Sequence, residues 1–191
     1  MRNIHNKIIL IITLVFGFAI QSKASLGIQT AIGLPFLSQT GINYYFSNSL
    51  GLDISTNALN LDLGTASINL SMPQVLVNYH PFAGSFFIGL GMGQLTSSVS
   101  ATDSTTSIKI SAEIKANTTV GKMGWMWGFD NGGFWFGIDY SMIMPSNPTT
   151  TITAPGVSTT SSEYLDLVDA STKYGESSLG NITYARFGWQ F

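Results

Sequence analysis

The chain has 191 residues, of which 45% are hydrophobic and only 9% are charged, and it contains no cysteine. The lack of cysteine excludes a disulfide framework, a thiolate metal site and a lipid-modified N-terminal cysteine. No segment beyond the N-terminal region approaches 18 uninterrupted apolar residues, so the sequence predicts no transmembrane helix.

The N-terminal region has the three parts of a secretory signal peptide. A short basic segment precedes an apolar run over Ile8–Ile20, which is too short for a spanning helix of about 20 residues. Ser22 and Ala24 then place small residues at the −3 and −1 positions of a cleavage site. We therefore predict a signal peptide over residues 1–24 and a single domain over residues 25–191.

Cleavage at this site changes the charge balance. Three of the eight Lys and Arg residues precede the site, whereas all ten Asp and Glu residues follow it, so the mature chain carries a formal charge of −5. A negative chain of this kind disfavours nucleic acid as a partner, because binding to phosphates requires a basic surface.

Apolar and polar side chains alternate with the period of a β-strand over most of the mature chain. The alternation predicts eight strands, at Leu26–Leu34, Gln39–Ser47, Leu50–Leu59, Thr65–Tyr79, Phe86–Gly93, Ile108–Phe129, Phe134–Met142 and Asn181–Phe191. A tilted strand crosses a bilayer in about 9–11 residues, and single-chain bacterial barrels have an even number of strands. We therefore predict an all-β fold, an eight-stranded antiparallel up-and-down transmembrane β-barrel.

Short and long connections alternate along the chain, as in barrels with short inner turns and long outer loops. The short connections are Ser47–Ser49, His80–Gly84 and Asp130–Gly133. Two segments rich in Ser, Thr and Pro, Thr96–Ser107 and Pro145–Ser162, are predicted to be loops. A capping box that begins at Thr160 predicts a short helix over Ser161–Tyr174, in the connection before the last strand.

The alternation changes parity once, within the fourth predicted strand. Ile68, Leu70 and Met72 share one face, but the apolar side chains after Pro73 fall on positions of the opposite parity. Since one extra residue in a strand moves every later side chain to the other face, this pattern predicts a β-bulge at Met72–Pro73.

The last predicted strand is the most specific feature of the sequence. Thr183, Ala185, Phe187, Trp189 and Phe191 share one face, while Ile182, Tyr184, Arg186, Gly188 and Gln190 share the other. The pattern resembles the closing strand of bacterial outer-membrane barrels, and the whole chain resembles small eight-stranded barrels of the OmpA/OmpX type. The resemblance implies an integral protein of the outer membrane of a Gram-negative bacterium, in contact with its lipids. It also implies that Phe187, Trp189 and Phe191 are read by the barrel-assembly machinery.

Three charged residues fall on predicted inward positions of spanning strands, namely Asp53, Asp139 and Arg186. Ionisable groups at membrane depth are candidates for a proton or ion path, but a narrow lumen filled by paired charges explains them better. Asp139 and Arg186 are each five residues from the ends of neighbouring strands, so we expect them at equal height and in contact. We interpret the three residues as a structural charge network.

Catalysis is the less favoured interpretation. Lipid-modifying outer-membrane enzymes use a histidine with a serine and an acid, whereas His80 is predicted to lie in a solvated inner turn with no acidic neighbour. The sequence therefore predicts a non-enzymatic monomer, without cofactor or metal, whose barrel anchors surface loops for structural, adhesion or recognition roles. A narrow channel or small-molecule carrier, a lipid-modifying enzyme and a soluble periplasmic barrel remain as alternatives.

Overall fold

The computed structural model describes residues 24–62, 64, 66–102, 109–129, 132–153 and 177–191. Within these ranges the chain forms the strands β1 (Ser25–Leu34), β2 (Ser38–Ser47), β3 (Leu50–Asp62), β4 (Ala66–Tyr79), β5 (Phe86–Thr102), β6 (Lys109–Trp127), β7 (Gly133–Thr153) and β8 (Leu179–Gln190). Residues 1–23 of the predicted signal peptide, and the helix predicted over Ser161–Tyr174, lie outside the described residues.

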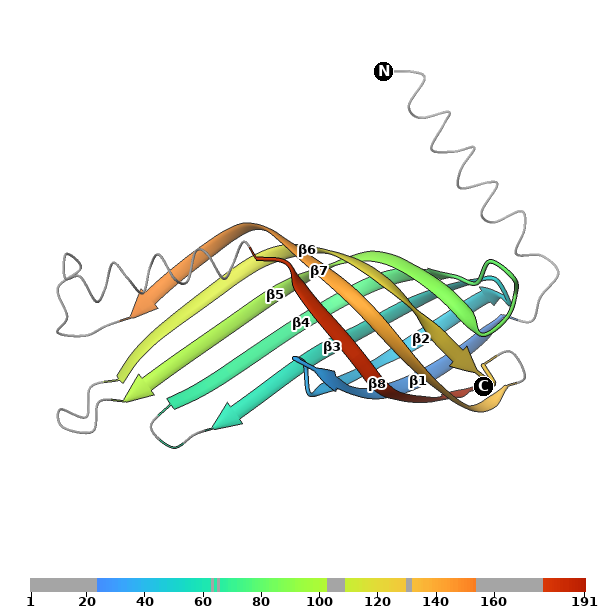
Figure 1. Cartoon of the computed structure of the whole chain (residues 1–191), viewed down its shortest axis with the longest axis horizontal. Coiled ribbons are helices and arrows are strands. Elements are labelled where there is room, and N and C mark those ends of the chain that lie inside the picture. The colour runs from blue at the N-terminus through green and yellow to red at the C-terminus, as the bar shows by residue number, and fades with distance from the viewer. Residues whose placement is uncertain (1–23, 63, 65, 103–108, 130–131, 154–176) are drawn as a thin grey trace, which may run out of the picture.

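The eight strands form a closed ring. Each strand pairs antiparallel with its neighbours in sequence, and β1 closes the ring by pairing with β8 (Figure 1). The predicted all-β, eight-stranded antiparallel arrangement is therefore confirmed. Within the described ranges, no helix is long and apolar enough to cross a membrane.

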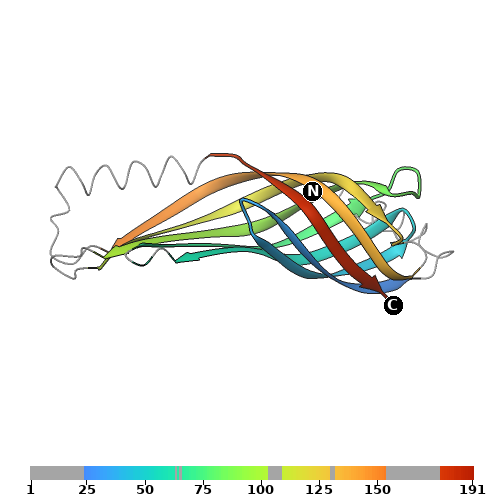
Figure 2. The ribbon, with the colours of Figure 1, turned by 60° about the horizontal axis from the view of Figure 1, so that its bottom comes forward.

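The strands differ greatly in length, so the wall of the barrel is uneven. β1 and β2 have 10 residues each, whereas β5, β6 and β7 have 17, 19 and 21. All strands are aligned at the end with the short turns, which we call the short-turn end. At the other end β3–β7 continue well beyond β1, β2 and β8, as Figures 1 and 2 show. We call this projecting sheet the extension; it consists of residues 57–62, 66–72, 95–102, 109–118 and 145–153.

The extension corrects the prediction of long loops. Residues 96–102, predicted to begin a loop, belong to β5, and Ser97 is paired with Ile114 of β6. Residues 145–153, also predicted as loop, belong to β7, and Thr151 is paired with Glu113. Their Ser and Thr side chains are typical of loops, but neighbouring strands satisfy their backbone groups and hold them in a sheet.

The predicted bulge at Met72–Pro73 is wrong. The pairing between β3 and β4 runs without interruption through this point, with Thr56 opposite Pro73 and Asn57 opposite Met72. Met72 is fully buried inside the barrel. The change of parity in the sequence therefore has another cause: along β4 the apolar side chains move from the inside of the wall to the outside.

A bulge does occur in β8, where the sequence suggested strict alternation. The pairing of β8 shifts register against both β1 and β7, between Thr183 and Ala185. Before the bulge, Asn181 and Thr183 are buried and Ile182 is exposed; after it, Arg186 is buried and Phe187 is exposed. The face predicted to carry Thr183, Ala185 and the terminal aromatics is thus divided between two sides of the wall.

The outside of the ring is strongly apolar near the short-turn end. Six apolar residues whose strand alternation predicts an outward position, on five of the strands, are all exposed there: Ile28, Ile54, Leu90, Phe136, Ile138 and Phe187. The alternate positions of the same strands point inward and are mostly polar or small. In this part of the molecule the usual distribution of a water-soluble barrel is reversed.

Candidate functional site

The polar side chains inside the ring form the first candidate site. Those that are buried there include Gln29, Gln39, Asn43, Asp53, Ser55, Gln74, Asn78, Lys122, Asp139, Asn181, Arg186 and Gln190. Eight strands leave room for little more than side chains in the interior. Buried charges in such a space must pair with one another and with polar neighbours, because an isolated buried charge is very costly.

Arg186 lies at the centre of these contacts and is only 1% exposed. Its Nη2 atom is 2.9 Å from Asp139 Oδ2, and its Nη1 atom is 3.7 Å from Asp53 Oδ2. Nη2 also donates a hydrogen bond of 2.9 Å to Gln39 Oε1. Asp53 accepts a further hydrogen bond of 2.6 Å from Gln29 Nε2. The structure thus brings the three residues expected from the sequence, Asp53, Asp139 and Arg186, into one network.

Lys122 is a fourth member that the sequence reasoning missed. Its Nζ atom is 3.8 Å from Asp139 Oδ1, and both side chains are almost completely buried. Two carboxylates therefore face two cations, and the network is neutral when all four groups are charged. The signal was present in β6, where Lys122 has the inward parity of its buried neighbours Val120 and Met126, next to the exposed Met123. The polar residues of the preceding stretch, from Lys109 to Asn117, alternate with the opposite parity, so Lys122 does not continue their pattern.

The geometry of the Asp139–Arg186 contact differs from the expected one. Asp139 is paired with Thr183, and Arg186 with Gly137, because Phe134 is opposite Trp189 and not opposite Phe191, as the expected height required. The two residues are not directly opposite, so the long guanidinium side chain reaches Asp139 diagonally. Diagonal partners across a ladder are within reach of long side chains, which explains why the ion pair forms in spite of the shifted register.

Aromatic side chains fill the ring at the short-turn end. This inner plug consists of Tyr45, Phe87, Met126, Phe129 and Trp135, all of them buried, together with His80. The Tyr45 hydroxyl lies 3.4 Å from Met126 Sδ, and the His80 ring stacks on Phe129 with centroids 4.2 Å apart. Packing of this kind excludes water from the end of the lumen.

His80 is therefore buried, and the prediction of a solvated turn histidine is wrong. Its Nδ1 atom is 2.8 Å from the Gly84 carbonyl oxygen, and its ring also contacts Tyr45 and Phe87. The turn after β4 folds over the lumen instead of projecting into solvent, and the side chain of its first residue becomes part of the inner plug. Aromatic surface on three sides compensates for the loss of water around the imidazole.

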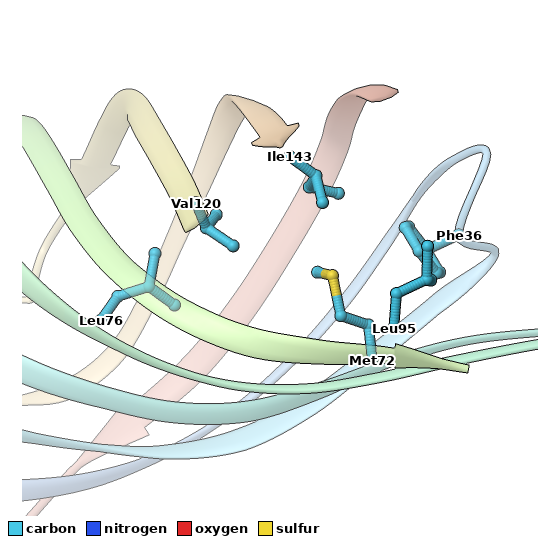
Figure 3. Close-up of a cluster of buried hydrophobic side chains, with 6 residues drawn as sticks. All are labelled: Phe36, Met72, Leu76, Leu95, Val120 and Ile143. Atoms are coloured by element: carbon cyan, nitrogen blue, oxygen red, sulfur yellow. The ribbon is translucent and has the colours of Figure 1, made fainter. Parts of the chain in front are cut away.

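A second apolar cluster, the outer plug, lies toward the extension. It consists of Phe36, Met72, Leu76, Leu95, Val120 and Ile143, whose side chains point toward one another from the β1–β2 turn and from β4, β5, β6 and β7 (Figure 3). Leu70 and Leu179 pack against it. The charge network is thus accompanied by closely packed apolar side chains on either side along the lumen.

The predicted assembly residues lie on the outside of the ring near its short-turn end. Phe187, Trp189 and Phe191 are all exposed, and the Phe187 ring stacks on Phe134 of β7 with centroids 6.1 Å apart. The Phe191 amide donates a hydrogen bond of 2.8 Å to the Leu26 carbonyl oxygen, so even the last residue is held against β1. Their recognition by an assembly machinery stays a prediction.

The outer surface changes character along one row of paired residues, which we call the switch row: Thr56, Pro73, Gln94, Asn117 and Ser146. On the short-turn side of this row the outward side chains of β3–β7 are largely apolar. On the extension side they are polar apart from Ala58, namely Asn60, Asp62, Ser67, Asn69, Ser71, Thr96, Ser98, Ser100, Ser111, Glu113, Lys115, Thr149, Thr151 and Thr153.

The inner surface changes in the opposite sense. Beyond the switch row the inward side chains become mostly apolar and include Leu59, Leu61, Ile68, Leu70, Met72, Leu95, Val99, Ala112, Ile114, Ala116 and Ile152. The extension therefore has the polar-out, apolar-in pattern of a soluble sheet, whereas the ring below it has the reverse. This exchange of faces, without any bulge in β4, is what the sequence showed as a change of parity.

No group of three or more His, Cys, Asp or Glu residues able to hold a metal ion occurs within the described ranges. The acidic residues of the lumen, Asp53 and Asp139, are held apart by the Arg186 guanidinium, which contacts both. The arrangement inside the ring favours charge neutralisation and packing.

Comparison with known proteins gives a fold but no family. Neither a protein-family model nor a curated protein matches the sequence. Among solved structures, a major outer membrane protein from Thermus thermophilus is similar, with a TM-score of 0.62 and 12% identity over 88% of this chain and 99% of that one.

Two further solved structures from Acinetobacter baumannii match with lower scores. CarO2 has a TM-score of 0.48 and 10% identity, over 89% of this chain and 100% of its own. CarO has a TM-score of 0.47 and 10% identity, over 87% of this chain and 96% of its own. At such identities, the similarity to the Thermus protein shows a common eight-stranded fold and nothing about activity.

Proposed function

We propose that this chain is an integral outer-membrane protein of a Gram-negative bacterium, a non-enzymatic and non-conducting monomeric barrel that anchors the extension on the cell surface. The observation that carries the proposal is the exchange of faces at the switch row. An apolar outer surface is stable next to lipid, and a polar outer surface is stable in water. A wall that changes from one to the other along a single row is suited to a membrane boundary.

The height of the apolar belt supports the proposal. On β7 the outward apolar residues run from Phe134 to Met144, which is ten residue steps. Ten steps measure about 33 Å along a strand and about 23 Å along the membrane normal at a tilt of about 45°. The apolar band of outer-membrane barrels is about 25 Å tall. Exposed aromatic side chains at the short-turn end, among them Tyr79, Trp125, Trp127, Phe134 and Trp189, fit an interfacial girdle.

The two ends of the barrel suggest its orientation. Barrels of this class have short turns on the periplasmic side and long segments outside. The short-turn end is then periplasmic, and the extension projects from the cell. Insertion in this orientation requires the assembly machinery that the resemblance implies, with Phe191 as the terminal residue of its signal.

The content of the lumen favours an anchor over a channel. The inner plug, the charge network and the outer plug occupy the lumen one after another. Ions pass only through pathways that replace their hydration shell, and two apolar plugs offer no such path. We expect no unitary conductance in planar bilayers above the lipid baseline. Discrete current steps with the purified, refolded protein would refute the non-conducting barrel.

The position of His80 favours a non-enzymatic role. A histidine that acts as a general base must reach a substrate, but His80 is fully buried in the inner plug at the proposed periplasmic end. Lipid A isolated from cells that express the protein should therefore have an unchanged mass. Loss or gain of an acyl chain that depends on His80 would contradict this part of the proposal.

Cysteine labelling tests location and orientation together, because the chain has no native cysteine. With Ser98→Cys on the outer face of the extension, a membrane-impermeant maleimide should label intact cells. With Ser49→Cys in a short turn, labelling should require permeabilised cells. The purified outer-membrane fraction should contain both variants, with heat-modifiable migration on gels. Labelling of both sites in intact cells, or recovery in the soluble periplasm, would refute the proposal.

A carrier for a small apolar molecule is the second candidate. It is favoured by the apolar inner surface of the extension, on which Leu61 and Val99 are still 37% and 43% exposed. A carrier of this type would be silent in conductance records. Faster uptake of a fluorescent fatty acid by cells that express the protein, abolished by Val99→Glu but not by Ser98→Glu, would support the carrier.

A further inference from the structure

The outer wall of the barrel has a groove where a convex surface is expected. It is an open hollow of about 610 Å³ that crosses β2, β3, β4 and β5. All of its lining residues belong to described parts of these four strands. A volume of this size falls within the range of small-molecule sites, which is about 300–1,000 Å³.

The groove has an apolar lip on the side of the short-turn end. Ile42, Ile54, Val75 and Met92 form this lip; they follow one another in a single row across the four strands, each paired with the next. All four are exposed, and Met92, at 76%, is the most open of them. In the proposed membrane location this lip faces the hydrocarbon.

The opposite lip is formed by Thr56, Pro73 and Gln94 of the switch row and by Thr40 of β2, which is paired with Thr56. Thr40, Thr56 and Gln94 line it with hydroxyl and amide groups, and all three are exposed. No charged side chain lines any part of the groove. The groove is therefore amphipathic across its width, with an apolar side toward the bilayer centre and an uncharged hydrogen-bonding side toward water.

Two glycines line the hollow, at positions of inward parity. A Cβ added to Gly41 would lie 2.5 Å from the Ile54 carbonyl oxygen, and one added to Gly93 would lie 2.6 Å from the Pro73 carbonyl oxygen. Both obstacles are backbone atoms of the neighbouring strand and cannot give way as a flexible side chain can. Glycine therefore allows the neighbouring strands to approach this closely along the groove.

We propose that this groove, on the membrane location proposed above, seats one bilayer lipid, with an acyl chain against Ile42, Ile54, Val75 and Met92. The ester-linked backbone of the lipid lies against the hydroxyls of Thr40 and Thr56 and the amide of Gln94. A lipid at the interface has its acyl chains toward the bilayer centre and its ester groups toward water. The apolar and polar lips of the groove lie in the same order. The lining has no cation or carboxylate. The site therefore recognises the acyl chain and the ester region, and it does not discriminate between headgroups of different charge.

A second protein is a poorer occupant of the same groove. The hollow is three inter-strand spacings wide, about 14 Å. Specific protein interfaces bury about 800 Å² on each partner, with aromatic or arginine anchors at their centre. The groove supplies neither that area nor those anchors, and its apolar lip is continuous with the belt that faces lipid.

Native mass spectrometry of the full barrel chain tests the proposal. The protein is refolded in mixed micelles of a mild detergent with either phosphatidylethanolamine or phosphatidylglycerol. We expect one retained lipid per barrel, with affinities for the two lipids that agree within about threefold. Val75→Trp fills the groove and should lower the retained fraction at least tenfold. Val77→Trp lies on the same face of β4, two residues farther from the switch row and outside the groove, and should retain the lipid as the wild type does.

The outcomes separate this proposal from the proposed function. Equal retention by Val75→Trp and Val77→Trp, or no retained lipid in the wild type, would overturn the lipid site. A tenfold preference for one headgroup charge would overturn the uncharged recognition. A dimer in the spectrum that Val75→Trp abolishes would replace the lipid by a second copy. Heat-modifiable migration shows that each variant is folded, and the cell-labelling experiment judges the membrane location independently of all these results.

Discussion

Removal of Arg186 should show how strongly the lumen depends on its charge network. Arg186 is 1% exposed and has carboxylate partners at 2.9 and 3.7 Å, so Arg186→Met leaves two buried carboxylates and only Lys122. Breaking a buried pair by removing one partner costs about 3–5 kcal/mol. Lys122→Met should cost less, since Lys122 makes a single ion pair at 3.8 Å.

A double-mutant cycle pairs Arg186→Met with Asp53→Asn, and the second mutation restores the neutrality of the charge network. In Arg186→Met with Asp53→Asn, one cation and one carboxylate remain, and they are already paired with each other. The double variant should therefore be more stable than the sum of the two single effects by about 2 kcal/mol, within the range of about 0.5–3 kcal/mol for contacting residues. Unfolding in urea from lipid vesicles, followed by tryptophan fluorescence and by gel migration, measures all four corners of the cycle.

An exposed ion pair in the same protein serves as the control. Lys115 Nζ and Glu113 Oε1 are only 2.7 Å apart, but these side chains are 55% and 43% exposed on the extension. Their coupling should be at most about 0.5 kcal/mol, since water screens them and their side chains lose entropy on pairing. If the coupling between Arg186 and Asp53 is as small as that of the control pair, burial does not strengthen the network and the reasoning is wrong.

Three further changes probe the wall of the barrel. Phe191→Asp should reduce the amount of folded protein in the outer membrane far more than Phe46→Asp, as measured by heat-modifiable migration; equal levels would remove the special role of the last residue. Ile138→Arg in the apolar belt should cost about 2–4 kcal/mol, whereas Thr151→Arg on the extension should cost about 0–1 kcal/mol, in the same urea titration. Gly188→Ala should cost about 1–3 kcal/mol, because its Cβ would collide with the Trp135 indole of the inner plug; a cost near zero would mean that the plug is loosely packed.

The sequence predicted the ring because each strand carries its own evidence. Alternation over Leu26–Leu34 or Phe134–Met142 needs no partner to be recognised, and the structure keeps these segments within a few residues of the expected ends or extends them. The sequence underestimated the lengths of β5 and β7 because their Ser-rich and Thr-rich ends have no apolar outer face. Their strand structure depends on pairing with β6, which is a tertiary property.

The charge network was only partly predictable, for a related reason. Asp53, Asp139 and Arg186 stand out as charges within apolar alternation, whereas Lys122 follows a polar stretch of β6 that has the opposite parity. Arg186 is opposite Gly137 because Phe134 pairs with Trp189, two residues from the alignment of strand ends that the sequence suggested. A shift of two residues leaves the alternation of faces unchanged, so the sequence pattern does not reveal it. Contacts formed by long side chains tolerate such a shift. The two partners could therefore be identified, although the prediction that they lie directly opposite each other was wrong.

The exchange of faces shows why one rule of alternation could not be applied along whole strands. Alternation reports that two sides of a wall differ, but the solvent outside decides which side is apolar. Within β4, Val75 and Val77 point outward and Met72 points inward, although the backbone register is unbroken. If lipid surrounds the lower part of the ring and water the extension, both choices bury the apolar side chains. The parity change then marks the depth at which the surrounding medium changes, and a sequence with such a change at one common row across neighbouring strands encodes its own membrane boundary.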